Sequence, residues 1–134
     1  MPERVYELDR NECLERLQRG AFLGRLAYVA DGRPQIVPIN YVADSESVTF
    51  CTAEGTKLNA LAQGAPVAFE IDDSRPLYHA GWSVVVTGTA QEVTDPDHLA
   101  RLRSGPLKSW AVSPMAHWIR ITIEGISGRA IDEE

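Results

Sequence analysis

The chain is poor in cysteine and has no long apolar run. Its two cysteines, Cys13 and Cys51, match neither a CxxC motif nor a metal-binding spacing, so both are expected to be reduced and structural. No stretch approaches the roughly 20 apolar residues that cross a bilayer. The first twelve residues mix acidic and basic side chains and lack the apolar core of a signal peptide. These absences predict a cytoplasmic protein without a membrane partner.

Positive charge and catalytic or metal-binding motifs are also scarce. The chain has 13 lysines and arginines against 19 aspartates and glutamates, with a net charge of −6 and a pI near 5.0. Because an acidic surface repels phosphate backbones, nucleic acid is not expected as a partner. His79, His98 and His117 lack HxxxH or HExxH spacing, so no metal site is predicted. A GxSxG motif is also missing, and no catalytic residue is assigned.

What is present is the composition of one soluble globular domain, residues 1–134. Apolar residues make up 44% of the chain and charged residues 24%, a balance that can bury a core. Turn signals separate segments rich in strand-forming residues, at 22–29, 34–42, 47–52, 66–72, 82–93 and 116–126. Short helices are predicted at 9–19, 56–63 and 96–103. Strands that do not alternate regularly with helices predict a mainly β fold, an antiparallel barrel with peripheral helices.

The first helix carries a clear start signal. Asp9 and Glu12 form a capping-box pattern. Glu12 with Arg16, and Glu15 with Arg19, have the i,i+4 spacing and orientation of stabilising ion pairs. The sequence therefore predicts a helix that packs on one edge of the barrel.

Hydrogen-bond donors gather where the third strand meets the second helix. Thr52 ends the strand, Gly55 follows it, and Thr56 and Lys57 open the helix. Free backbone N–H groups, two hydroxyls and one ammonium at such a junction suit a terminal phosphate. The spacing does not match the P-loop. In the alternative interpretation Thr56 caps the helix and Lys57 is solvated, and the residues alone leave both interpretations open.

The second strand contains a proline, which cannot donate to a sheet. Pro38 is therefore expected at an edge or a bulge. Neighbouring backbone groups would then be free to meet a flat heteroaromatic ring, with Asn40 available for a side-chain contact. The alternative is an edge strand that the proline protects from further pairing.

Trp82 and Ser83 stand at the start of the fifth strand. Trp82 could cover a ring or seal a subunit interface, although an aromatic residue packed in the core is the commoner case. Trp110 and Trp118 carry the same ambiguity, and packing is the expectation for both.

Five segments follow one another in an order that is typical of one family. They are GRLAYVADGRPQIVPINYV, FCTAEGTKLNAL, VAFEID, GWSVVVTGTAQEV and WIRITIEGISGR. Together they resemble the flavin-binding split barrels related to pyridoxamine-phosphate oxidase, from the first helix to Arg129. The pattern is closer to the small relatives described as nitroimidazole-resistance-like or flavin-reductase-like. The resemblance implies a six-stranded antiparallel split β-barrel that forms a homodimer, with two FMN molecules at the subunit interface.

Carried over by position, the resemblance implies cofactor contacts at ten residues. Backbone groups of four would line the edge of the flavin ring: Val37, Pro38, Ile39 and Asn40. Three would hold the phosphate: Thr52, Thr56 and Lys57. Two would lie beside the ring or the ribityl chain, Trp82 and Ser83, and one basic residue would lie near the cofactor, Arg129. Thr56 stands where the family often has an arginine, and the chain ends soon after Arg129, so oxidation of vitamin B6 is not expected.

The resemblance therefore implies an FMN-dependent oxidoreductase that acts on an unidentified small molecule. A non-enzymatic protein that binds or sequesters flavin is the first alternative. A deazaflavin-dependent reductase is the second, although the longer acidic tail of a deazaflavin calls for more positive charge than the chain offers. An unliganded structural or interaction barrel is the third. The substrate and the electron donor are not predicted.

Overall fold

The structure, a computed structural model, describes residues 3–19, 23–53, 55–106 and 116–133. Its strands are β1 (Glu3–Leu8), β2 (Leu23–Ala30), β3 (Arg33–Asn40), β4 (Val42–Ala43), β5 (Ser47–Thr52), β6 (Gln63–Arg75), β7 (Ala80–Glu92) and β8 (His117–Glu133). Its helices are α1 (Arg10–Arg19), α2 (Thr56–Leu61), α3 (Pro96–Arg103) and the 3-10 turn η1 (Pro76–Tyr78). Within the described ranges, none of the helices has the length and apolar character needed to span a bilayer.

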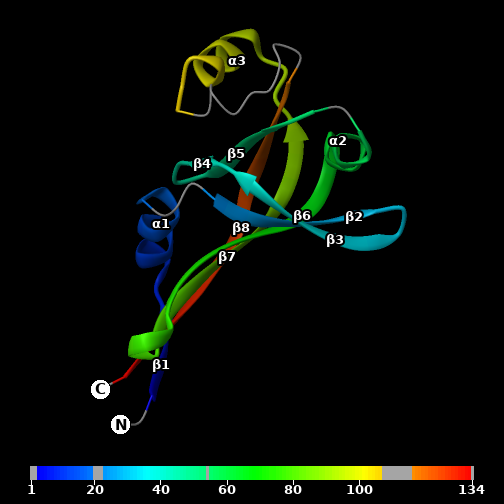
Figure 1. Cartoon of the computed structure of the whole chain (residues 1–134). Coiled ribbons are helices and arrows are strands. Elements are labelled where there is room, and N and C mark those ends of the chain that lie inside the picture. The colour runs from blue at the N-terminus through cyan, green and yellow to red at the C-terminus, as the bar shows by residue number, and fades with distance from the viewer. Residues whose placement is uncertain (1–2, 20–22, 54, 107–115, 134) are drawn as a thin grey trace.

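The strands form one antiparallel sheet with the order β3-β2-β6-β7-β8-β5-β4, and β1 pairs with β8 outside this path. The sheet curves strongly around itself, and the helices lie at its periphery (Figure 1). The predicted mainly β antiparallel fold is therefore confirmed. The predicted segments correspond to β2, β3, β5, β6, β7 and β8, and the 47–52 prediction matches β5 at both ends.

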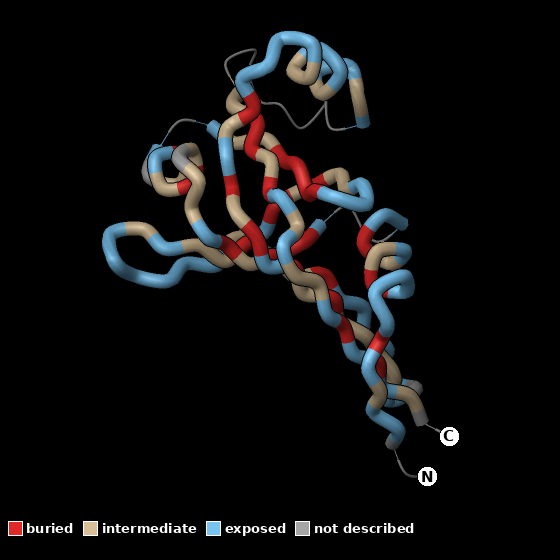
Figure 2. Tube along the Cα trace, turned by 180° about the vertical axis from the view of Figure 1, so that it is seen from behind, coloured by how far each residue is buried: buried red, intermediate tan, exposed pale blue. Residues whose placement is uncertain are grey.

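The inner face of the curved sheet holds the core (Figure 2). Val48 and Phe50 of β5 pair with Ile121 and Ile119 of β8, and all four are fully buried. The isoleucines alternate along β8, as the sequence predicts for a strand with one face in the core. Phe69 of β6 belongs to the same cluster.

Trp118 is buried too, although it lies on the opposite face of β8 from Ile119. It packs with Val93 in a second cluster that includes Leu99 and Leu102 of α3. The expectation that Trp118 serves packing is confirmed. Trp110 lies outside the described residues.

The long strands extend beyond their predicted ends. The predicted strands 66–72 and 82–93 extend towards each other, because residues 73–75 belong to β6 and residues 80–81 to β7, with only η1 and its flanks as the connection. The last predicted strand, 116–126, is also too short, because β8 continues to Glu133 and its residues 128–133 pair with β1. The Arg4 guanidinium donates to both oxygens of Asp132, at 3.2 and 3.1 Å, across this pair. Strand β1 was not predicted, because its charged residues give no strand pattern in the sequence. The strand is recognised only from its pairing with β8.

Helix α1 begins as predicted. The Glu12 backbone N–H donates to Asp9 at 2.8 Å, and the Asp9 N–H donates to Glu12 at 3.1 Å, which is a complete capping box. Arg19 pairs with Glu15 at 2.6 Å. The predicted Glu12–Arg16 pair is wrong: Glu12 serves the cap, and the Arg16 guanidinium lies over the ring of Trp82 instead.

Candidate functional site

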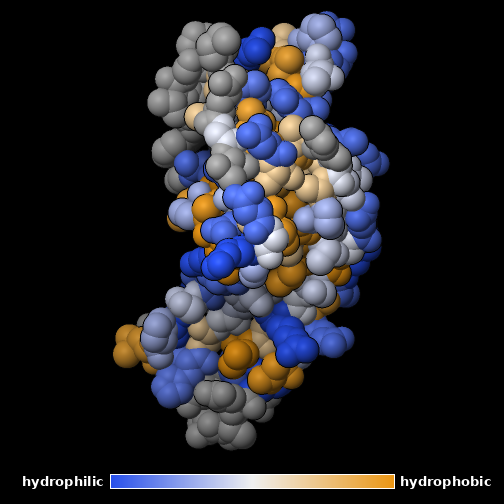
Figure 3. All heavy atoms as spheres, turned by 90° about the vertical axis from the view of Figure 1, so that its right-hand side faces the viewer, coloured by the Kyte–Doolittle hydropathy of each residue, from blue (hydrophilic) through white to orange (hydrophobic). Residues whose placement is uncertain are grey.

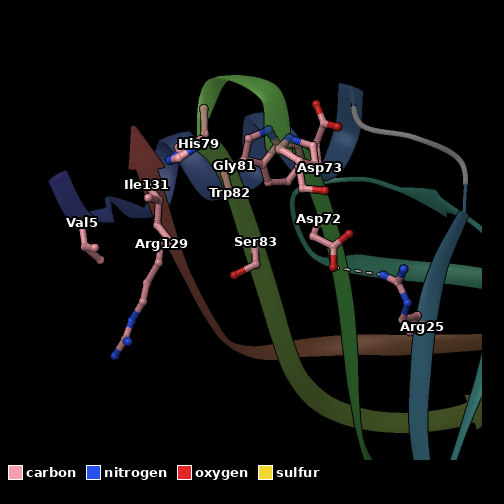
Figure 4. A pocket seen from close by; sticks show the side chains of 13 residues that line it. Val5, Arg25, Asp72, Asp73, His79, Gly81, Trp82, Ser83, Arg129 and Ile131 are labelled. Carbon is pink, nitrogen blue, oxygen red and sulfur yellow. Dashed lines mark hydrogen bonds and ion pairs between the residues drawn. The ribbon is translucent and has the colours of Figure 1, made fainter. Parts of the chain in front are cut away.

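A groove of about 740 Å³ lies against β6, β7 and β8 on the outer face of the sheet (Figure 4). The strand register puts Asp72, Ser83 and Arg129 in one row across these three strands. Directly opposed residues point to the same face, so the three side chains share the groove. Its lining residues are Val5, Arg25, Asp72, Asp73, Ser74, Pro76, His79, Ala80, Gly81, Trp82, Ser83, Arg129 and Ile131.

The groove is electrostatically divided. Asp72 and Asp73 belong to its β6 side, and Arg129 to its β8 side (Figure 4). Arg129 is exposed and forms no ion pair within the described part of the chain. A guanidinium that no carboxylate neutralises can bind an anion or a carbonyl oxygen.

Arg25 of β2 lines the same groove, and sequence reasoning did not single it out. Its Nη1 donates to Glu70 at 3.0 Å and to Asp72 at 3.1 Å, both on the neighbouring strand β6. Burial, and then the nearby Asp72, raise the pKa of Glu70, whereas Arg25 lowers it. The pairing of Arg25 with Glu70 across 45 residues of sequence exists only once β2 and β6 are aligned.

Trp82 lies on the opposite face of β7 from Ser83, because side chains alternate along a strand. Its ring packs against the main core, and the Arg16 guanidinium carbon lies 5.0 Å from the ring centroid. Trp82 lines the groove and also a smaller cavity of about 240 Å³ to which Arg16 contributes. Trp82 therefore packs against the core, as expected, and it is also among the residues that line the groove.

The candidate residues of β3 alternate between the two faces of the sheet. Val37 and Ile39 pack against the core, whereas Pro38 and Asn40 point outward. β3 is at one end of the sheet order, so the predicted edge position of Pro38 is confirmed. With two of the four side chains committed to the core, contacts of this strand with a ligand would use backbone groups and the outward side chains.

The corner between β5 and α2 holds the predicted phosphate site. Lys57 is half-buried there, and burial lowers its pKa, while the adjacent Cys51 opposes that shift. Gly55, with φ of 151°, is the N-cap of α2, and Thr56 is the first helical residue. The alternative interpretation is therefore wrong in taking Thr56 as the cap, and Lys57 is partly exposed. The Thr52 hydroxyl donates only weakly, to the Ala53 carbonyl at 3.4 Å.

The groove brings together only three of the ten candidate residues. Trp82, Ser83 and Arg129 line the groove, which includes no residue of β3, β5 or α2. The groove lies toward the end that carries η1 and β1, and α2 lies on the other side of the barrel (Figure 1). Within the described ranges, no three His, Cys, Asp or Glu side chains are grouped so that they could hold a metal ion.

The outer face of the sheet carries exposed apolar side chains. By register it carries most of the exposed large apolar side chains, namely Val5, Leu23, Val29, Ile36 and Ile131. The same face carries Pro38, Asn40, Ser83 and Arg129. Figure 3 shows apolar side chains between charged ones at the end of the molecule that carries β1 and η1. An exposed apolar face with polar residues among its members is typical of a surface that another molecule covers.

Fold and groove together define an antiparallel split barrel with an open outer face. The family model described as pyridoxamine 5'-phosphate oxidase matches residues 9–130. The chain therefore belongs to this family, as its sequence motifs predict.

Solved structures and a curated relative agree with this assignment. The FAD binding protein from Mycobacterium smegmatis is 36% identical, with a TM-score of 0.81 over 96% of this chain and 100% of that one. A putative pyridoxamine 5'-phosphate oxidase from Corynebacterium glutamicum is 33% identical, with a TM-score of 0.82 over 97% of this chain and 100% of that one. The uncharacterized protein Rv0080 of Mycobacterium tuberculosis is 35% identical over 129 residues, which cover 92% of this chain and 84% of that protein.

Proposed function

We propose that the protein is a cytoplasmic flavin-dependent oxidoreductase that binds FMN and acts on a small molecule. Membership of the pyridoxamine 5'-phosphate oxidase family supports a flavin cofactor. The similar Mycobacterium smegmatis protein is described as FAD binding, so FAD is the alternative flavin. When bound, the flavin supplies the hydride or electron transfer, and the protein contributes binding, orientation and electrostatics.

The proposal also includes a homodimer in which each cofactor site is shared by two chains. The observation that carries it is that the groove includes only three of the ten candidate residues, while Pro38 and Asn40 of β3 lie on the same outer face as the groove. A second copy that covers this face would bring the groove of one chain towards the edge strand β3 of the other. Two-fold pairing suits such a self-complementary surface.

The residues present fit a flavin nucleotide. A groove of about 740 Å³ lies within the range of small-molecule sites, roughly 300–1,000 Å³. Lys57, whose charged form burial disfavours, would gain a partner from a phosphate. Arg129, without an ion pair among the described residues, can meet a carbonyl or an anion. Ser83 adds a hydroxyl to the same row.

The spectrum of the purified protein tests the proposal most directly. We expect the absorption bands of oxidised flavin, and mass spectrometry of the extracted cofactor should identify FMN. FAD in the extract would correct the cofactor while leaving the flavin proposal intact, and a deazaflavin would overturn it. Bleaching of the bands by NADH or NADPH, followed by reoxidation with an electron acceptor, is expected of an oxidoreductase. Binding without turnover would favour the sequestering alternative.

A protein purified without cofactor that also fails to bind added FMN or FAD would contradict the proposal. The oligomeric state is checked separately, by light scattering at several protein concentrations. A monomer that still binds flavin with full affinity would exclude the shared site.

A further inference from the structure

The smaller cavity, of about 240 Å³, lies against the face of the sheet opposite the row that holds Ser83. One row of directly opposed residues crosses four strands on that face: Asp73 of β6, Trp82 of β7, Ala130 of β8 and Tyr6 of β1. All four line the cavity. The neighbouring row, which holds Val84 and Leu8, is buried in the core. The cavity therefore lies where the buried core of this face ends.

The middle of the row is a small residue between two aromatic ones. Trp82 and Tyr6 belong to strands on either side of β8, and Ala130 stands between them. Neighbouring strands are about 4.8 Å apart, so the two aromatic side chains leave the sheet roughly 10 Å from each other. Both are half-buried and pack against the core. The methyl group of Ala130 leaves room between them for a flat apolar group.

Arg16 of α1 adds a cation to this cavity. Its guanidinium carbon lies 5.0 Å from the centroid of the Trp82 ring, within the roughly 6 Å range of a cation–π contact. Arg16 is half-buried, and within the described residues no carboxylate pairs with it. A guanidinium placed over a ring still has N–H donors along its edge, and a carboxylate can accept two of them side by side.

The other charges of the cavity nearly cancel. Arg75 and Asp73 both line it, with Nε and Oδ2 3.9 Å apart and both side chains more than half exposed. One cation therefore offsets one carboxylate, and the charge of Arg16 remains. This net positive charge favours an anion, although the whole chain carries a net charge of −6.

The size of the cavity limits the ligand to a small molecule. A protein cavity of about 150 Å³ is sufficient to hold benzene. The 240 Å³ found here has room for one six-membered ring and a carboxylate attached to it.

We propose that this cavity is a binding site for a small aromatic carboxylate. The ring of the ligand lies beside Ala130, against Trp82 and Tyr6, and the carboxylate accepts hydrogen bonds from Arg16. The inference goes beyond the proposed function and does not rest on it, because Arg16 does not line the groove and the site needs no flavin.

Titration with benzoate is the first test, read by fluorine NMR of protein labelled with 5-fluorotryptophan. The chain has three tryptophans, and the Trp82 resonance is the one that Trp82→Phe removes. Benzoate should shift this resonance in a saturable way. Benzamide has the same ring without the charge, and should bind at least about ten-fold more weakly. Acetate has the charge without the ring and should cause no saturable shift. Equal affinities for benzoate and benzamide, or no saturable shift with benzoate, would overturn the inference.

Matched variants test the assigned cation. Arg16→Met should weaken benzoate binding at least about ten-fold and leave the weak binding of benzamide unchanged. The control is Arg19→Met, which removes an exposed arginine of the same helix that pairs with Glu15 and should leave benzoate binding unchanged. Equal losses in the two variants would overturn the inference. A loss in Arg129→Met without one in Arg16→Met would place benzoate in the groove and would also overturn it.

Filling the space between the aromatic rings tests the location. Ala130→Leu should abolish the benzoate-dependent shift of the Trp82 resonance, because its side chain occupies the place of the ligand ring. Thermal unfolding shows whether this variant is folded. If it is not, Tyr6→Leu removes one aromatic wall and should weaken benzoate and benzamide alike. Undiminished benzoate binding in a folded Ala130→Leu or Tyr6→Leu protein would overturn the inference.

Discussion

The groove on β6, β7 and β8 and the corner between β5 and α2 are built in different ways. The groove takes Arg25, Asp72, Ser83 and Arg129 from four strands that meet only in the folded sheet. The corner takes its candidates from residues 52–57, which are neighbours along the chain. One region depends on strand register and the other on local backbone structure.

This difference explains which region the sequence describes better. The residues of the corner could be grouped before the fold was known, whereas the groove could be assembled only from the register. The two regions also differ in how exposed their charged groups are. The groove is open and its charges are exposed or paired, whereas Lys57 is half-buried with its charged form disfavoured. Substitutions in the two regions should therefore have different consequences for folding and for binding.

The largest effect is expected where the register of the groove strands is set. Gly88 of β7 lies at a register shift opposite β8, and a Cβ added there would lie 1.9 Å from the Thr122 carbonyl oxygen. Gly88→Val should lower the free energy of unfolding by about 3 kcal/mol, because the backbone must move. Urea denaturation measures it. The exposed neighbour Thr87, replaced by valine as a control, should change stability by less than about 0.5 kcal/mol. A fully stable Gly88→Val protein would show that the register is not tightly constrained here.

The corner should respond in binding and not in folding. Lys57→Met should weaken flavin binding about ten- to a hundredfold, because a charge-assisted phosphate contact is lost. Without ligand the variant should be no less stable than the wild type at neutral pH. Burial lowers the folded-state pKa of Lys57 below its unfolded value, so its charged form costs stability at low and neutral pH. That cost should fall as pH rises from the folded-state pKa towards the unfolded one.

Calorimetric titration with FMN and urea denaturation at neutral and alkaline pH measure both effects. Arg101→Met, which removes an equal charge from an exposed position on α3, is the matched control. Unchanged flavin affinity would remove Lys57 from the site.

Mixed dimers sharpen the comparison further. If each site takes Lys57 from one chain and Arg129 from the other, a hybrid of Lys57→Met and Arg129→Met chains should regain one fully intact site. Two weakened sites in the hybrid would place both residues in one chain's half of the site.

The smallest effect is expected at the edge of the groove. Arg25→Met removes the cation shared by Glu70 and Asp72, but this cation is more than half exposed. The stability loss should be small and should shrink as salt is added. It should be larger at pH 7 than at pH 4, because the raised pKa of Glu70 keeps that carboxyl largely protonated in acid. Denaturation at both pH values measures it, with the exposed Arg33→Met as control. A loss independent of pH and salt would show that Arg25 acts through packing.

Much of the fold followed from local patterns. The capping box of α1, the alternation of Ile119 and Ile121, the bounds of β5 and the edge position of Pro38 each depend on a few neighbouring residues. The pattern of the family motifs was also sufficient to identify the family that the matching model shows.

The sequence by itself determined the class of fold, the family and the residues of the β5–α2 corner. Tertiary structure decided that Arg16 serves Trp82 and not Glu12, that Arg25 bridges Glu70 and Asp72, and that β1 extends the sheet along β8. The physical reason is the distance along the chain between the residues that interact. A cap or an alternating strand is specified by residues within a few positions of one another, whereas a contact between strands depends on a register that the whole sheet sets at once.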